Sequence, residues 1–345
     1  MAMAHRREWV DYGKGIGIIL VVYAHLLSSG YHAGLPIQEH FFSLSDSIIY
    51  SFHMPLFFFL AGFLVEQSYN KRRAREFVGD KIKFLVYPYL IWSFLQAISE
   101  LLFAGHSARG VTAADLWAIP YLPLAQFWYL YALLWMYVIY ALLRHWNKFT
   151  YAALLVIAAL LFYFPIKSEI LALQGFSTGF IFFVVAVLIK KYNGGLENLT
   201  ISPWIIIGLL VSLLVVGVYI FEYRIEPARL TNGLHPFYFL LLAALGIAFC
   251  LSLAQLLARK KCCQVVQTLG IYSLQIYLVH MLAGVGTRVI LRHFLHLEDP
   301  FIHMIIGVGA GLFAPVMLYK IARQMDFPYL FAPGRAHHKS LKVIT

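Results

Sequence analysis

A lysine and a histidine interrupt the first strongly apolar stretch of the chain, WVDYGKGIGIILVVYAH. Lys14 and His25 are eleven residues apart, and in an α-helix this spacing returns to nearly the same face about 16 Å further along the axis. An imidazole can take up or release a proton near neutral pH. The pattern favours general-base chemistry at His25 above a cation at Lys14. The alternative is an interfacial lysine and a histidine that serves helix packing.

Two later apolar stretches repeat one polar stripe, in which the second and third residues follow the first by four and seven positions. The stripes are Asp46, Tyr50 and His53, and Ser273, Tyr277 and His280. Helical spacing places His53 and His280 near the depth of His25, which predicts a polar chamber. Each could instead be a satisfied core residue. Because no two of the three histidines have the short spacing of a zinc motif, we predict no metal site.

The densest cluster of charge is NKRRAREFVGDKIK, residues 70–83. Arg72 and Arg75 are three residues apart, and paired guanidinium groups suit phosphate. A donor that carries several phosphates, such as coenzyme A, would be attracted to this segment. The alternative is a topology signal that also binds anionic lipid headgroups.

The elements that must position these residues are membrane-spanning helices. The chain has 345 residues, of which 61% are hydrophobic and 12% charged, and its mean hydropathy is +0.75. This composition excludes a soluble enzyme, a secreted disulfide scaffold and a disordered chain. Ten apolar runs are long enough to cross a membrane: 13–29, 46–66, 84–104, 124–144, 149–165, 171–190, 203–222, 236–258, 268–287 and 302–320. We predict an all-α bundle of about ten transmembrane helices in one domain, 1–345, with spans over 13–320 and a tail at 321–345.

The net charge of +11 indicates orientation rather than nucleic-acid binding. Of the 27 Lys and Arg residues, 20 fall in one alternating set of connectors and six in the other. The positive-inside rule then places both termini in the cytoplasm. The first run resembles a signal peptide, but Lys14 and His25 interrupt it and nine more runs follow, so we expect it to be retained.

The chain resembles the acyltransferase-3 family of membrane proteins, in its branch of fucose O-acetylase-like or exopolysaccharide acetyltransferases. Lys14 and His25 match the family's basic residue and histidine, and Arg72 and Arg75 match its Arg-x-x-Arg pair. Three further segments resemble family motifs: FHMPLFFFLAGF at 52–63, QFWYLYALL at 126–134 and SLQIYLVH at 273–280. Ala61 stands where the family usually has serine. The resemblance covers the chain from about Trp9 to Arg323.

This resemblance implies transfer of an acetyl group from cytoplasmic acetyl-coenzyme A to a sugar hydroxyl at the outer face of the bacterial inner membrane. The acceptor would be a polysaccharide or a lipid-linked oligosaccharide, and the other partners are membrane lipids, with no nucleic acid. We expect His25 to be the general base. The full assignment is His25, Tyr277 and Ser273 as catalytic residues; Lys14, Arg72, Arg73, Arg75 and Trp128 at the donor; and Asp46, His53, His280, Glu39, Glu226 and His235 at the sugar.

Two other classes fit part of the pattern. A transporter or flippase of a lipid-linked sugar would use the same histidines as proton relays. A non-catalytic subunit of a polysaccharide machine would tolerate the loss of a motif residue, of which Ala61 is the one example.

Overall fold

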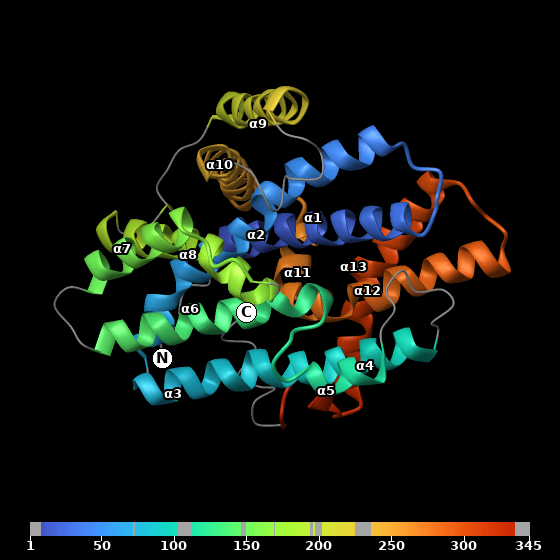
Figure 1. Ribbon diagram of the computed structural model, residues 1–345, viewed down its shortest axis with the longest axis horizontal. Helices are drawn as coiled ribbons and strands as arrows, with labels where there is room; N and C mark the ends of the chain where they lie inside the picture. Colours follow the sequence, from blue (N-terminus) through green and yellow to red (C-terminus); the bar gives the residue numbers. More distant parts are fainter. Residues whose placement is uncertain are drawn as a thin grey trace. The chain divides into compact units, whose positions relative to one another are not determined.

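The computed structural model is helical wherever it has regular secondary structure (Figure 1). It describes residues 8–71, 73–102, 112–145, 150–168, 170–193, 196, 202–224 and 236–334. The helices are α1 (Glu8–His32), α2 (Glu39–Tyr69), α3 (Ala74–Lys81), α4 (Tyr87–Leu102), α5 (Ala113–Ala118), α6 (Trp128–His145), α7 (Thr150–Tyr163), α8 (Leu171–Tyr192), α9 (Pro203–Arg224), α10 (Pro236–Lys260), α11 (Gln264–Ile271), α12 (Ser273–Val289) and α13 (Pro300–Gln324). The all-α prediction is confirmed.

Nine helical segments among the described residues are long and apolar enough to cross a membrane. The segment that contains α3 and α4 is one of them, because the π-helical turn Ile82–Val86 joins the two helices. The remaining predicted run, 149–165, forms α7. Its 14 residues extend about 21 Å, which is less than the roughly 30 Å of a bilayer core.

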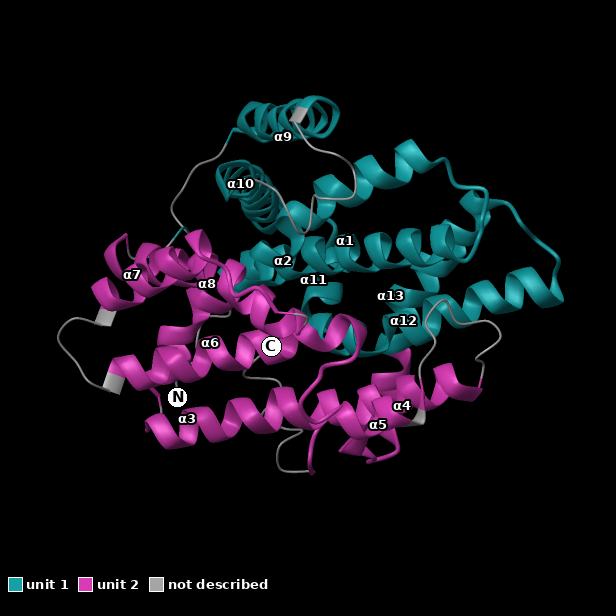
Figure 2. Cartoon of the chain, in the orientation of Figure 1, with its two compact units in different colours: residues 1–60, 196–316 teal, residues 61–195, 317–345 magenta. Residues whose placement is uncertain are grey.

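The chain forms two compact units (Figure 2). Unit 1 consists of residues 1–60 and 196–316, and unit 2 of residues 61–195 and 317–345. The division falls inside α2 and α13, so each of these helices contributes to both units. Unit 1 contains the three histidines predicted to share a depth, and unit 2 contains the arginine-rich segment.

Within unit 1, α1 packs against α10, α11 and α12. Two glycines allow α1 and α11 to approach each other closely. Gly15 lies against the carbonyl of Val266, and Gly270 lies against the carbonyl of Asp11, so a Cβ at either position would overlap a backbone oxygen. The short helix α11 thereby fixes the first turns of α1 and also the start of α12, two residues further on.

The helices of unit 1 have defined relative directions. His25 of α1 contacts His280 of α12, and further along both helices Arg292 donates a hydrogen bond to the carbonyl of Ala33. These two contacts make α1 and α12 parallel. The directions of α2 and α9 are opposite, because His40 pairs with Glu222 at 2.7 Å and Ile48 packs against Gly217.

Within unit 2, α6 and α8 also run parallel. Trp128 packs over Gly175 near the start of both helices, and the rings of Tyr140 and Phe183 meet further along. The chain returns between them through α7. The Tyr151 ring at the start of α7 lies near Tyr192 at the end of α8, so α7 is antiparallel to α8.

Candidate active site

Two imidazoles of unit 1 meet between α1 and α12. His25 Nδ1 lies 3.1 Å from His280 Nε2, and their ring centroids are 5.2 Å apart. His280 is fully buried, whereas His25 is partly exposed. The residues that contact each other are 255 positions apart in the sequence. The parallel packing of α1 and α12 therefore creates this pair.

Backbone carbonyls determine which nitrogen of His280 carries its proton. His280 Nδ1 lies 2.9 Å from the carbonyl oxygen of Tyr277 and 3.1 Å from that of Ile276. A carbonyl only accepts hydrogen bonds, so Nδ1 must be the protonated nitrogen. In the neutral ring Nε2 then accepts from His25 Nδ1–H. With its proton on Nδ1, His25 has its free lone pair on Nε2, which is the nitrogen that can act as a base.

Tyr50 and His53 of α2 extend the cluster. The Tyr50 ring stacks with His25 at 6.1 Å and meets the His53 ring edge-on at 4.7 Å. His53 is fully buried and donates from Nδ1 to the Ile49 carbonyl at 2.7 Å. Its Nε2 is buried and has no hydrogen-bond partner among the described residues. The structure thus brings the three predicted histidines into one cluster, in which the buried Nε2 of His53 has no partner among the described residues.

The other predicted residues of α2 and α12 lie at different distances from the pair. The buried Tyr277 ring is 6.1 Å from the His280 ring. Ser273 begins α12, seven residues and therefore about 10 Å along the axis before His280. Asp46 is half-buried, two turns before His53, and Glu39 is exposed at the start of α2. Glu226 and His235 lie outside the described residues.

The predicted donor residues belong to both units. Lys14 is half-buried on α1, in the stretch that packs against α11. Arg73 and Arg75 are exposed at the start of α3, where Arg73 is the N-cap and its backbone N–H donates to Glu76 at 3.4 Å. Trp128 packs over Gly175 in unit 2. Arg72 lies outside the described residues.

Some polar residues of the apolar segments were not predicted to be functional. Lys81 of α3 is buried, with its Nζ 4.2 Å from the Tyr137 ring centroid, although its segment was predicted to be a connector. Arg288 and His303 are buried in unit 1. Arg288 follows His280 by eight residues, which is close to two helical turns, so the spacing rule that found the histidines would also have found this arginine.

Comparison with known proteins places the chain in a family. Residues 7–320 match the acyltransferase-3 family, which is described as an acyltransferase domain. The chain belongs to this family. The resemblance inferred from the sequence motifs is therefore confirmed: the chain is a multi-pass membrane protein of an acyltransferase family, a class whose reaction requires an acyl donor.

Two curated relatives are similar to part of the chain, and both are named Nodulation protein NolL. The protein of Sinorhizobium fredii (strain NBRC 101917 / NGR234) is 31% identical over 170 residues, which are 49% of this chain and 45% of the relative. The protein of Mesorhizobium japonicum (strain LMG 29417 / CECT 9101 / MAFF 303099) is 34% identical over 85 residues, 25% of this chain and 22% of the relative. The matched segments thus span less than half of each relative. No solved structure matches the chain.

Proposed function

We propose that this acyltransferase moves an acetyl group from cytoplasmic acetyl-coenzyme A to a sugar hydroxyl at the outer face of the bacterial inner membrane. The acceptor is a polysaccharide or a lipid-linked oligosaccharide. The observation that carries the proposal is the His25–His280 pair, in a chain that belongs to a membrane acyltransferase family. The family match runs through residues of both compact units, which supports one catalytic domain formed by the whole chain.

Ten membrane crossings with both termini in the cytoplasm complete the topology. Because α6 and α8 run parallel, the chain must cross back between them, and α7 is the helix that connects them. The parallel directions of α1 and α12 require an odd number of crossings between them. That number is odd when α7 is counted and even when it is not. The excess of Lys and Arg in the connectors on one side supports a cytoplasmic N-terminus.

His25 is the general base in this mechanism. Its Nε2 accepts the proton of the sugar hydroxyl while the hydroxyl oxygen attacks the thioester carbonyl of acetyl-coenzyme A. The carbon–sulfur bond then breaks, coenzyme A leaves as its thiolate, and the proton held by His25 returns to that sulfur. His280 is a positioning residue rather than a sugar ligand, because it is fully buried and its hydrogen bonds are to His25 and to backbone carbonyls. Tyr277 is our candidate donor to the thioester oxyanion.

The donor and the acceptor approach His25 from opposite faces of the membrane. Lys14, Arg72, Arg73 and Arg75 hold the phosphates of coenzyme A at the cytoplasmic side. Ser273 and Trp128 are, with Tyr277, the candidate donors to the thioester oxyanion. An extended pantetheine arm matches the roughly 16 Å between Lys14 and His25 on α1. His53, with its buried unpartnered Nε2, and Asp46 bind the sugar, with Glu39, Glu226 and His235 at the outer connectors.

The His25→Ala variant tests the base. We expect the purified variant to bind coenzyme A as the wild type does but to transfer no acetyl group from labelled acetyl-coenzyme A to the glycans of the producing cell. Wild-type transfer by this variant would contradict the assignment.

Movement of a lipid-linked sugar that needs a proton gradient and no acetyl-coenzyme A would contradict the enzyme class. Label trapped on the wild-type protein without acceptor would replace direct transfer by a route through an acyl-histidine.

A further inference from the structure

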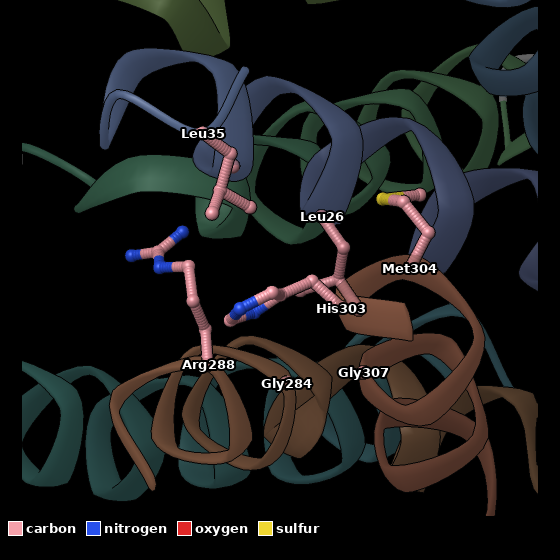
Figure 3. Close-up of a pocket in the computed structure, with 8 residues that line it drawn as sticks. Leu26, Leu35, Gly284, Arg288, His303, Met304 and Gly307 are labelled. Carbon is pink, nitrogen blue, oxygen red and sulfur yellow. The ribbon is translucent and has the colours of Figure 1, made fainter. Parts of the chain in front are cut away.

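A small pocket opens one helical turn beyond the His25–His280 pair, between α1, α12 and the start of α13 (Figure 3). Leu26, which follows His25, and Gly284, which follows His280 by four residues, form its inner end. Arg288 and His303 line it further along, and both side chains extend into the space between the helices. In the proposed topology this is the outer side of the pair, from which the acceptor arrives.

Arg288 brings an unbalanced cation into this pocket. It is 9% exposed, and its Nη1 donates a hydrogen bond of 2.6 Å to Ser29 Oγ. A guanidinium group has five N–H donors, and within the described part of the chain no carboxylate forms an ion pair with this one. A buried cation without a counter-charge is costly in a membrane protein. The site is therefore suited to an anionic ligand.

The charge of Arg292 adds to the same field. It lies one turn beyond Arg288 on the continuation of α12 and donates from Nη1 to the carbonyl of Ala33 at 2.6 Å. This contact also involves an uncharged partner. Two cations on successive turns thus face the end of α1, and their combined potential attracts an anion to the pocket.

His303 supplies the second half of the site. It is 5% exposed, and its Nε2 lies 2.8 Å from the carbonyl of Leu297, so Nε2 carries the proton. Nδ1 of the neutral ring is then an acceptor. This Nδ1 is buried and has no hydrogen-bond partner in the part of the chain that the structure describes. The pocket thus offers donors for a carboxylate and one acceptor for a hydroxyl.

The pocket has room for about one water-sized group. We propose that it receives the carboxylate of an acidic sugar of the acceptor, which pairs with Arg288 while the sugar ring stays at the opening of the pocket. A hydroxyl of the ring, directly or through a bridging water, donates to His303 Nδ1. Sugar acids carry both groups on one ring. The proposal rests on the proposed function and sharpens it, because it names the acceptor class as a glycan that contains a uronic acid. Binding here holds the glycan one to two helical turns beyond the proposed base, so the hydroxyl that reacts belongs to the same sugar or to its neighbour in the glycan.

The test compares two probes that differ at one carbon, methyl glucuronide and methyl glucoside. Binding of each is measured by equilibrium dialysis with the full-length protein in phosphatidylcholine nanodiscs, without acetyl-coenzyme A. We expect the wild type to bind the glucuronide about tenfold more tightly, as suits a charge-assisted bidentate contact. Arg288→Gln should remove the preference and Arg288→Lys should retain part of it. Arg323→Gln, the matched loss of an exposed arginine at the end of α13, should leave it unchanged.

Three results would overturn the proposal. They are equal binding of the two probes by the wild type, an undiminished preference in Arg288→Gln, and loss of glucuronide binding when phosphatidylglycerol replaces phosphatidylcholine. The last would identify a lipid headgroup as the anion. Thermal unfolding of each variant verifies that it is folded, and Arg288→Lys provides the comparison if Arg288→Gln is not. Because the probes bind without a donor, failure of acetyl transfer is detected separately, by the assay of His25→Ala.

Discussion

The carbonyl oxygens beside His280 Nδ1 decide how protons are arranged over the central pair. They hold His280 in one tautomer, and His280 in turn orients His25. A histidine whose second nitrogen is fixed in this way is both better aligned and a stronger base. In the proposed mechanism, this arrangement lets the fully buried His280 influence a reaction that it does not touch.

Removing the orienting acceptor should lower turnover without affecting the donor. We expect His280→Leu to lower kcat about 10- to 100-fold, the usual effect of losing such a partner, with the KM for acetyl-coenzyme A unchanged. His280→Gln should recover part of the rate because its amide oxygen can accept from His25 Nδ1–H. Steady-state acetyl transfer measures both constants, with the exposed His293→Gln as the control. Full activity in His280→Leu would show that the pair has no catalytic role.

His53 should be functionally important and thermodynamically unfavourable. Its buried Nε2 has no partner among the described residues, and an unsatisfied polar atom costs about 1–3 kcal/mol. We expect His53→Phe, which keeps a ring against Tyr50, to unfold at the same or a higher temperature. Its KM for the acceptor should rise several-fold while that for the donor stays constant. A lower unfolding temperature with an unchanged acceptor KM would assign His53 to packing alone.

Periodicity predicted which side chains the structure brings together better than it predicted how they pair. The stripes that contain His53 and His280 could be read from offsets of four and seven along one helix. The pairing of His25 with His280 joins residues of two distant helices, and no local pattern indicates which nitrogen faces which. Arg288 lies just beyond the predicted span 268–287, so it was assigned to a connector. In the structure, α12 and a π-helical turn continue to Phe294.

At the scale of elements, α11 anchors the start of α1 through two close backbone contacts. Because Gly270 lies against the carbonyl of Asp11, we expect Gly270→Ala to destabilise the protein by about 1–3 kcal/mol, as overpacking does. The matched control is Gly286→Ala in α12, where an added Cβ meets nothing within 4 Å. That change should be neutral or stabilising, since alanine favours a helix by up to about 1 kcal/mol. Thermal unfolding in detergent compares them, and equal unfolding temperatures would contradict the packing described.

The sequence predicted spans better than connectors. The apolar runs correspond to helices because a helix that spans the bilayer needs about 20 mostly apolar residues, and such a run is visible in the sequence. The connector predicted at 67–83 is largely helical instead, with α2 extending to Tyr69 and α3 beginning at Ala74. Lys81 is buried there because the Tyr137 ring lies against its ammonium group. A partner of this kind, on another helix, is invisible to a hydropathy window.

At the scale of the whole molecule, the role of α7 decides the topology. If α7 crosses the membrane, its end and the end of α8 lie on opposite faces. In a background with Cys250, Cys262 and Cys263 replaced by serine, we expect Phe164→Cys to react with an impermeant maleimide from outside intact cells. Lys191→Cys should react only after permeabilisation. Both positions are exposed, and labelling of Phe164→Cys only after permeabilisation would exclude a crossing by α7.

The most direct test of the account is acetyl transfer across a sealed membrane. Proteoliposomes with the cytoplasmic face outward receive labelled acetyl-coenzyme A outside and enclose glycans of the producing cell. The account predicts labelled glycan inside the vesicles with the wild type and none with His25→Ala, while intact acetyl-coenzyme A stays outside. Enclosed glycans that remain unlabelled, although the same protein acetylates glycans supplied on the outer surface, would contradict transfer through the membrane domain.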